Sequence, residues 1–360
     1  MIMDNQGISI EGASCPIPLS HNEQIVMGHG SGGKMTHDLI QNIFLQAFGH
    51  STTFPGDDGA IIRLPEEQHS DYRIVISTDS HVVTPLFFPG GDIGRLAVCG
   101  TVNDVSMMGA KPLYMTAGFI LEEGLEISTL IKIVNSMQSA AEEAGIQIIA
   151  GDTKVVQKGK ADGIYINTTG VGIRSYAHEI GGACAQPGDK LILSGSIGDH
   201  GMAVLSARGE LGFASEITSD VAPLNHLVES MLIASSEIHV LRDPTRGGLA
   251  TTLNEIAMQS EVSITINEES IPVHPAVQSV SEMLGFDPLY IANEGKLLAI
   301  VSPAEADQVL NAMHSDIYGT GAVIIGEVEK RGTGRVLLRT TIGTHRVIGM
   351  LSGEMLPRIC

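Results

Sequence analysis

The segment Arg73-Ile74-Val75-Ile76-Ser77-Thr78-Asp79-Ser80 predicts a strand over 73–76 that runs into a polar sequence with one carboxylate. Three other acidic sequences in the same half of the chain follow apolar segments or stand next to glycines: Gly56-Asp57-Asp58-Gly59, Asn103-Asp104 and Gly151-Asp152-Thr153. A single aspartate in such a place commonly forms a turn or caps a helix. Four such sequences in one half favour a common site, because converging carboxylates repel one another unless a cation binds between them. Mg²⁺ is the natural candidate, since it prefers oxygen ligands and usually shares them with substrate phosphates.

On both sides of this segment, apolar periodicity predicts alternating strands and helices. In the first half we expect strands over 24–27, 114–121, 146–149 and 164–173, and helices over 35–48, 93–108 and 129–144. Ser128 is the expected N-cap of the third helix, and Gly109 and Gly145 are expected to end the second and third. The helix over 35–48 is expected to bury one apolar face: Leu39, Ile40, Ile43, Phe44, Ala47 and Phe48.

The second half repeats this alternation. We expect strands over 190–193, 262–266, 297–301 and 322–328, and helices over 201–208, 246–259, 275–284 and 303–314. A chain of 360 residues is longer than one hydrophobic core usually organises, so an α+β fold of two layered domains is predicted. We place the domains at 24–180 and 181–347, with a flexible extension over 1–23 and a mobile tail over 348–360.

The net charge of −20 disfavours binding to nucleic acid, because it repels a phosphate backbone. The charge is compatible with a nucleotide whose phosphates reach carboxylates through a divalent metal. The 4 cysteines form no CxxC pair and no Cys/His cluster, which argues against a zinc site and against a disulfide framework. The sequence has no apolar run of membrane-spanning length and no secretory signal, so we expect a cytoplasmic protein with no membrane partner.

Residues Gly28-His29-Gly30-Ser31-Gly32-Gly33-Lys34 satisfy the spacing GxxxxGK between a predicted strand and a predicted helix. That spacing is typical of a P-loop, but Met35 stands where a P-loop has the Ser or Thr that contacts Mg²⁺. A phosphate-binding loop and a flexible lid or simple turn both remain open on this pattern. A P-loop nucleotide hydrolase is therefore a competing hypothesis.

The chain ends in Pro357-Arg358-Ile359-Cys360, so a thiol stands at the end of a segment that is predicted to move. Prenylation does not account for it, since the prenylated cysteine opens a four-residue C-terminal motif instead of closing it. A terminal thiol can carry a covalently attached group between sites. Glu294, in Asn293-Glu294-Gly295-Lys296 before a predicted strand, is a candidate general base, although a turn or ion-pair role is commoner for such a residue.

Taken together, these residues are similar to the HypE family of hydrogenase maturation proteins, within the superfamily of aminoimidazole ribonucleotide synthetase, selenophosphate synthetase and thiamine phosphate kinase. The resemblance covers about 25–360, and its specificity comes from the order of the motifs together with the terminal cysteine. The extension over 1–23 has no role in the family pattern. The motifs are His29-Gly30-Ser31-Gly32-Gly33, Ser77-Thr78-Asp79-Ser80, Pro85-Leu86-Phe87-Phe88-Pro89-Gly90-Gly91, Asn103-Asp104-Val105, Gly151-Asp152-Thr153-Lys154-Val155-Val156, residues 243–248, Ala292-Asn293-Glu294-Gly295-Lys296 and the four C-terminal residues.

The resemblance implies a PurM-like fold. Its N-terminal domain would bind Mg-ATP and dimerise through its sheet, and its C-terminal α/β domain would close over the nucleotide. It implies metal ligation by Asp58, Asp79, Asp104 and Asp152. The glycine segment would be a mobile phosphate cover rather than a P-loop, and the residues implied in ATP binding are Gly30, Ser31, Gly32, Gly33, Asp57, Asp79, Asn103 and Thr153.

The resemblance also implies the reaction and the partners. The carbamoyltransferase HypF would place a carbamoyl group on Cys360, and ATP-dependent dehydration would convert that group to a cyano group. The HypC–HypD complex would accept the cyanide for the iron centre of [NiFe]-hydrogenase. Glu294 would be the catalytic base and Lys154 would orient the carbamoyl group, while Pro357 and Arg358 would help to thread the tail into a tunnel. A non-catalytic carrier thiol and another ATP-dependent enzyme of the same fold are the alternatives.

Overall fold

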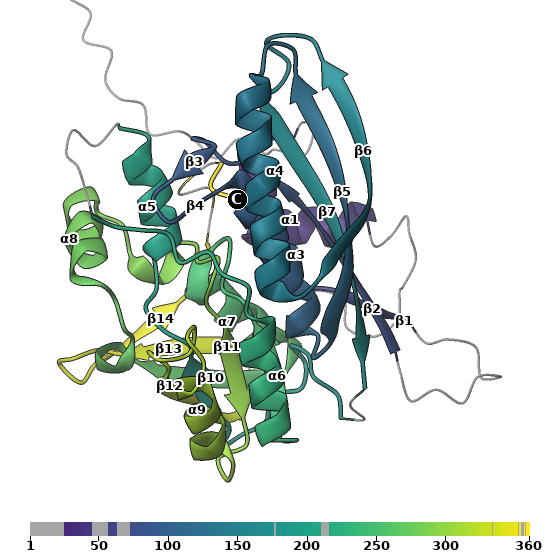
Figure 1. The fold of residues 1–360 in the computed structure, drawn as a ribbon. Coiled ribbons are helices and arrows are strands. Elements are labelled where there is room, and N and C mark those ends of the chain that lie inside the picture. Colours follow the sequence, from purple (N-terminus) through teal and green to yellow (C-terminus); the bar gives the residue numbers. More distant parts are fainter. Residues whose placement is uncertain are drawn as a thin grey trace, which may run out of the picture.

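The computed structural model describes residues 25–44, 57–62, 73–175, 178–209, 216–332, 334–351, 353, 356 and 358–360. The extension expected over 1–23 lies outside these residues. Each half of the chain is built around one main sheet, and the C-terminus lies between the two halves (Figure 1). No helix in the described ranges has the length and apolar character needed to cross a lipid bilayer.

The first half is a five-stranded sheet with the order β1-β2-β7-β5-β6, and helices α3 and α4 lie on one of its faces (Figure 1). β5 pairs antiparallel with β7 and parallel with β6, so β6 is an edge strand. The elements are β1 (Ala60–Ile62), β2 (Arg73–His81), β3 (Phe87–Phe88), β4 (Gly91–Asp92), α3 (Ile93–Met107), β5 (Lys111–Glu122), α4 (Ile127–Ala144), β6 (Gln147–Val156) and β7 (Ile164–Arg174).

Helix α3 begins and ends where its sequence provides caps. The Asp92 side chain accepts hydrogen bonds from the backbone N–H groups of Gly94 and Arg95, and Gly109 adopts a φ of 68° just beyond the end. Gly94 has a second function, because a Cβ atom at this position would lie 2.4 Å from the Ile133 carbonyl oxygen. The missing side chain therefore lets α3 and α4 pack closely.

The second half is a seven-stranded sheet with the order β14-β13-β10-β12-β8-β11-β9. One apolar cluster packs α7 on one face of the sheet, and another packs α6 and α9 on the opposite face. Burial on both faces explains why β8 and β11 are continuous apolar runs rather than alternating ones. The elements are β8 (Lys190–Leu193), α5 (Asp199–Ala207), α6 (Asn225–Ala234), β9 (Ile238–Arg242), α7 (Gly248–Gln259), β10 (Val262–Asn267), α8 (Pro275–Leu284), β11 (Leu298–Val301), α9 (Ala306–His314), β12 (Val323–Arg331), β13 (Arg335–Arg339) and β14 (His345–Ile348), with short 3₁₀ turns over Glu268–Ser270 and Pro288–Tyr290.

The start of the described chain differs from the prediction. In place of the strand over 24–27, a 3₁₀ turn spans Met27–Gly30, and the Ser31 hydroxyl stabilises it by donating to the Gly28 carbonyl oxygen. The predicted helix over 35–48 is α1 (Lys34–Leu39) followed by a π-helical turn, Ile40–Phe44, and its continuation lies outside the described residues. Its apolar face is not buried, since Ile40 and Ile43 are 39% and 55% exposed. Helical periodicity predicted the helix, but no other described element covers that face.

Other boundaries also shift. Strand β2 continues to His81, so Asp79 lies within the strand, and β6 extends through Asp152 to Val156. Helix α4 begins after Glu126, and Ser128 is not its N-cap, because its hydroxyl donates to the Glu126 carboxylate. The sequence prediction missed four elements of the second half: α6, β9, β13 and β14.

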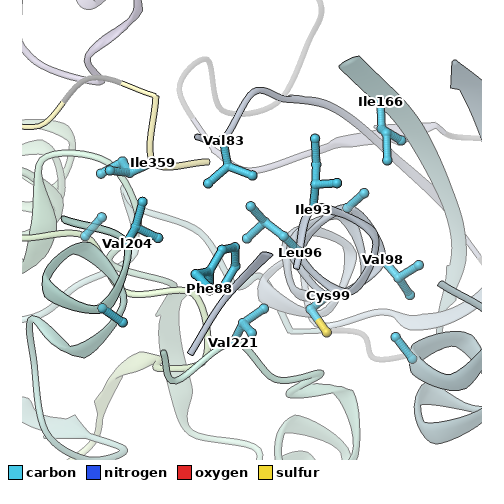
Figure 2. Close-up of a cluster of buried hydrophobic side chains, with 14 of the residues drawn as sticks. Val83, Phe88, Ile93, Leu96, Val98, Cys99, Ile166, Val204, Val221 and Ile359 are labelled. Carbon is cyan, nitrogen blue, oxygen red and sulfur yellow. The ribbon is translucent and has the colours of Figure 1, made fainter. Parts of the chain in front are cut away.

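The tail after β14 is docked in this structure. Ile359 forms an antiparallel bridge with Val83, and the backbone N–H of Val82 donates to the Cys360 carbonyl oxygen at 3.0 Å. Figure 2 shows Ile359 beside Val83 and Val204, in an apolar cluster that also contains Phe88 and residues of α3. The tail therefore packs into the core that joins the two domains.

Candidate active site

Two cavities meet at the C-terminal cysteine, and Cys360 and Arg246 line both of them. The outer cavity, about 720 Å³, is bordered by the glycine segment, by Asp162 and Tyr165 near the start of β7, and by the tail. The acidic cavity, about 600 Å³, lies toward the interior. Seven described carboxylic acids line the acidic cavity: Asp57, Asp58, Asp79, Asp104, Asp243, Glu255 and Glu294.

Ser77 on β2 connects the loop at 57–59 to α3. Its hydroxyl oxygen lies 2.7 Å from both the Asp58 carbonyl oxygen and the Asp104 carboxylate. Asp104 is half-buried, and desolvation together with the carboxylates of Asp243, Asp79 and Asp58 raises its pKa well above the usual value. The structure thus brings together Asp58, Asp79 and Asp104, three of the four predicted metal ligands.

Two further residues belong to this set: Arg242, the last residue of β9, and Asp243, which follows it. Sequence reasoning gave neither side chain a role. The Arg242 guanidinium lies 2.8 Å from the Asp58 carboxylate and 2.7 Å from that of Glu255. Burial still raises the pKa of Asp58 well above its usual value, and it raises the pKa of Asp243 to about 6. Asp57 lies at the rim, where it accepts a hydrogen bond from the Gly182 N–H at 2.9 Å. The acidic cavity therefore contains more carboxyl groups than the single positive charge of Arg242 can neutralise.

These carboxylates fit a divalent cation that is shared with phosphate. Within the described ranges, no group of three or more His, Cys, Asp and Glu side chains is arranged to hold a metal ion by itself. Burial and neighbouring carboxylates raise the pKa values of Asp58 and Asp104 well above the usual value, and a divalent cation between these groups would favour their deprotonated forms. Mg²⁺ commonly binds through one or two carboxylates and completes its coordination with phosphate oxygens and water.

Cys360 and Glu294 face each other at the junction of the cavities. Burial raises the pKa of the Cys360 thiol, and the nearby charges of Glu294 and Asp79 raise it further. Glu294 is 4% exposed, and burial and the charges of Asp79 and Asp243 raise its pKa well above the usual value. Asp220, in the loop before α6, holds the backbone of Glu294 by accepting a hydrogen bond from its N–H at 3.1 Å. The structure thus brings together the predicted carrier thiol and the predicted base.

Contacts from both domains fix the position of the tail. His200 on α5 contacts the Ile359 carbonyl oxygen through Nε2 and the Ser219 hydroxyl through Nδ1, and its ring packs against Phe88 with a centroid distance of 5.4 Å. Burial lowers the pKa of His200, which favours the neutral ring. Arg208 donates to the Arg358 carbonyl oxygen at 3.0 Å, and the Arg358 side chain pairs with Asp162 at 2.8 Å. Pro357 lies outside the described residues.

The glycine segment borders the outer cavity through Gly30 and Ser31 and the acidic cavity through Gly32. Gly32 adopts a φ of 76°, and a Cβ atom at Gly33 would lie 2.4 Å from the Leu351 carbonyl oxygen. Within the described residues no strand precedes α1, and α1 has only 6 residues. The segment is therefore not a P-loop. Phosphate covering by this segment stays a prediction.

Asp152, Thr153 and Lys154 lie on the exposed strand β6, and none of them lines either cavity. The Lys154 ammonium pairs with the Asp152 carboxylate at 2.6 Å, and the two side chains are 69% and 73% exposed. Within one chain, these residues are separated from the remaining predicted site residues. Their roles in metal binding, ATP binding and catalysis stay predictions.

Asn103 connects α3 to the second domain. Its side-chain amide donates to the carbonyl oxygens of Ala222 and Glu294 and accepts a hydrogen bond from the Leu224 N–H at 2.8 Å. These contacts hold the backbone of the predicted base. ATP binding by Asn103 stays a prediction, because its amide does not line the acidic cavity. Sequence reasoning gave no side-chain role to three residues of this site: Arg242, which ends β9, and Asp243 and Arg246, which follow it. Recognising β9 as a strand would have placed them at the end of a strand.

Comparisons with known proteins agree with this arrangement. Residues 56–174 match the AIR synthase related protein, N-terminal domain, and residues 186–339 match the AIR synthase related protein, C-terminal domain. The chain is 53% identical to the carbamoyl dehydratase HypE of Cupriavidus necator over 337 residues, which cover 94% of this chain and 95% of the relative.

Two solved structures are also similar. A HypE–HypF complex contains a chain with 50% identity and a TM-score of 0.81, and the match covers 87% of this chain and 99% of that one. A HypE structure in complex with ATP has 46% identity and a TM-score of 0.78, with 94% and 100% of the two chains covered. With both halves of the fold and nearly the whole sequence matched, the chain belongs to the HypE carbamoyl dehydratase family of AIR synthase related proteins.

Proposed function

We propose that the chain catalyses the ATP-dependent dehydration of an S-carbamoyl group on Cys360 to an S-cyano group during hydrogenase maturation. The observation that carries this proposal is the position of Cys360, which lines both the outer and the acidic cavity and shares the acidic cavity with the buried Glu294. A carrier thiol needs no such base and no cluster of carboxylates beside it. ATP binding is supported by the similar HypE structure in complex with ATP, and we place the nucleotide in the acidic cavity.

The carbamoyl group does not lose water readily, because its oxygen is a poor leaving group. In the proposed first step the carbamoyl oxygen attacks the γ-phosphorus of ATP, an O–P bond forms, and the P–O bond to ADP breaks with its electron pair on ADP. Glu294 accepts one proton from the nitrogen in this step and releases it to solvent. In the second step Glu294 removes the remaining N–H proton, the C–O bond breaks with its electron pair on phosphate, and the C≡N bond is completed. Positioning and electrostatic stabilisation dominate the catalysis of such phosphoryl transfer.

Mg²⁺ bound by Asp58, Asp79 and Asp104 would neutralise charge on the ATP phosphates. The chain's own residues supply the rest of the site. The contacts of His200 and Arg208 hold the tail so that the Cys360 sulfur stays at the junction of the cavities. Docking of Ile359 into the apolar cluster excludes water on that side of the thiol.

The proposal also includes a homodimer. Residues 147–155 of β6 are exposed at the edge of the first sheet, with Ile149 and Val155 59% and 68% exposed. An apolar cavity of about 710 Å³ lies between β5, α4 and β6 on this surface. A second copy that covers β6 would bury these side chains and bring Asp152, Thr153 and Lys154 to a neighbouring active site, where Lys154 would orient the carbamoyl group.

The similar HypE–HypF complex supports HypF as the partner that carbamoylates Cys360. The HypC–HypD complex would accept the cyano group once the tail leaves the core, so the mobility of the tail is part of the proposal. A non-catalytic carrier remains the alternative, but it leaves the acidic cavity without a use.

The proposal is tested by the intact mass of the chain after carbamoylation by HypF, with and without Mg-ATP. We expect the modified wild type to lose the mass of one water only when Mg-ATP is present, and Cys360→Ala to gain no carbamoyl group on the tail. A carbamoyl adduct that persists with Mg-ATP would make Cys360 a carrier thiol. Absence of any adduct would point to another ATP-dependent reaction of this fold.

A further inference from the structure

Among the residues that the structure describes, Arg246 is the one cationic residue that lines both the outer and the acidic cavity, and Cys360 is the other residue common to both linings. Arg246 lies directly after the Asp243-Pro244-Thr245 turn, two residues before α7. The Arg246 side chain is 43% exposed. It lies near the Cys360 thiol, where the two cavities meet. The interaction with Cys360 is the main reason that the pKa of the Arg246 guanidinium is raised.

Two contacts fix the guanidinium in place. Nη1 donates to the Gly30 carbonyl oxygen at 3.0 Å, and Nη2 lies 4.0 Å from the Asp79 carboxylate. The glycine segment packs directly on this residue, because a Cβ atom at Gly32 would lie 2.9 Å from the Arg246 Cβ and from its carbonyl oxygen. Arg246 therefore connects the segment predicted to cover phosphate, a predicted metal ligand and the carrier thiol.

Two other cationic side chains near the site are paired with carboxylates. Arg242 pairs with Asp58 and Glu255, and the Lys296 ammonium lies 3.2 Å from the Asp220 carboxylate. The oxygen of a carbamoyl group on Cys360 would lie among Glu294, Asp79 and Asp104, whose charges oppose the negative charge that develops on it. A guanidinium at the same junction is placed to offset this repulsion.

We propose that Arg246 is a catalytic residue that binds the carbamoyl oxygen on Cys360 and the phosphoryl group transferred to it. The inference rests on the proposed function. As the O–P bond forms, the guanidinium donates to the phosphoryl oxygens, and it stabilises their charge when the C–O bond breaks and the electron pair leaves with phosphate. The planar group has several N–H donors, so it can keep its bond to Gly30 while it binds the substrate. A lysine ammonium on a flexible stem cannot match both contacts.

The test uses the full chain, carbamoylated by HypF beforehand and then mixed with saturating Mg-ATP. The rate at which the chain loses the mass of one water is measured for wild type, Arg246→Lys, Arg246→Ala, and Arg346→Ala as the matched control. Arg346 on β14 also pairs with a carboxylate, Asp287 at 2.8 Å, but lines neither cavity. Affinity for ATP is measured by calorimetry on the same samples.

We expect Arg246→Ala to lower the saturating rate on the order of 10²–10³-fold, as for loss of one donor to a developing oxyanion. Its affinity for ATP should stay close to that of wild type, Arg246→Lys should be intermediate at most, and Arg346→Ala should resemble wild type. Added guanidinium ion at a non-denaturing concentration should restore part of the rate of Arg246→Ala, and methylammonium should restore less. A merely structural role would not give this rescue.

A rate close to wild type for Arg246→Ala would overturn the proposal, and so would a loss confined to ATP affinity with an unchanged saturating rate. A slow variant that guanidinium does not rescue would also overturn it, since Arg246 would then only hold the glycine segment. The wild-type sample separates this from the underlying reaction. If wild type loses no water with Mg-ATP, the proposed function itself fails, whereas loss of water by wild type and Arg246→Ala alike removes only the role of Arg246.

Discussion

At the scale of single residues, the site depends on a carboxylic acid that is kept away from water. Glu294 is buried beside Asp79 and Asp243, and Asn103 and Asp220 hold its backbone. Its raised pKa makes the deprotonated form a stronger base than an exposed glutamate, because basicity rises with the pKa. The same shift means that a larger part of the population is protonated near neutral pH.

Replacement of this base gives a direct prediction. Glu294→Gln is expected to accept the carbamoyl group and bind ATP but to dehydrate on the order of 10²–10⁴-fold more slowly, the usual contribution of a general base. In wild type the rate should fall as the pH is lowered through the raised pKa of Glu294, because the protonated carboxyl group cannot accept a proton. The inflection should therefore lie above 4.5, the usual value.

The measurement is the single-turnover rate of water loss from the carbamoylated chain as a function of pH. Glu282→Gln, on the exposed face of α8, is the matched control and should keep the wild-type profile. A Glu294→Gln variant with wild-type rates would remove Glu294 from the reaction.

Sequence reasoning identified most of these residues but did not show which residues lie beside them in the fold. Asp58, Asp79, Asp104, Glu294 and Cys360 follow from acidic sequences next to apolar segments, from the chain end and from the family resemblance. Arg242, Asp243 and Arg246 were given no side-chain role, although residues 243–248 form one of the family motifs. The short strand β9, which ends at Arg242, was not predicted. Proximity between residues of different domains depends on tertiary packing, which local periodicity does not encode.

At the scale of secondary structure elements, contacts within one chain do not explain why the side chains of β6 are exposed. A strand with exposed side chains on both faces and an unpaired edge invites association with another copy. Apolar side chains at 148, 149 and 155 support this reading, because contiguous exposed apolar surface commonly marks an interface. Lys154 and Asp152 on the same strand would make catalysis depend on that association.

The double variant Ile149→Lys with Val155→Lys is expected to be monomeric, because two ammonium groups would be buried without partners in the proposed interface. It should also lose the dehydration of carbamoylated Cys360, since Lys154 no longer reaches a neighbouring site. Light scattering gives the mass, which should exceed the 38.0 kDa of one chain for wild type and equal it for the double variant. Ile342→Lys, at a position 83% exposed in the second domain, is the control and should remain dimeric and active. A monomeric wild type that dehydrates its carbamoyl group would contradict the interface.

Among the elements, long periodic helices such as α3, α4 and α8 were predicted well because one face of each is strongly apolar. The helix over 35–48 was predicted on the same basis and is largely exposed in the part described, since no described element covers it. Strands β13 and β14 were missed, because each is short and lies near the sheet edge with exposed polar residues.

At the scale of the whole molecule, the tail connects the two domains. Ile359 and Leu356 belong to a core cluster that includes Val83 and Ile93 from the first domain and Met202 and Ile291 from the second (Figure 2). The docked tail places Cys360 between the acidic cavity and the outer cavity, where phosphoryl transfer and proton removal can act on one attached group. The central claim is that ATP phosphorylates the oxygen of that group.

The most direct test follows this oxygen. The wild-type chain is carbamoylated with a group that carries a heavy oxygen isotope and is then mixed with Mg-ATP in ordinary water, and the inorganic phosphate is analysed by mass spectrometry. The account predicts that the heavy oxygen appears in phosphate, in step with formation of the cyano group. Unlabelled phosphate, with the heavy oxygen retained on the tail or released into water, would contradict it.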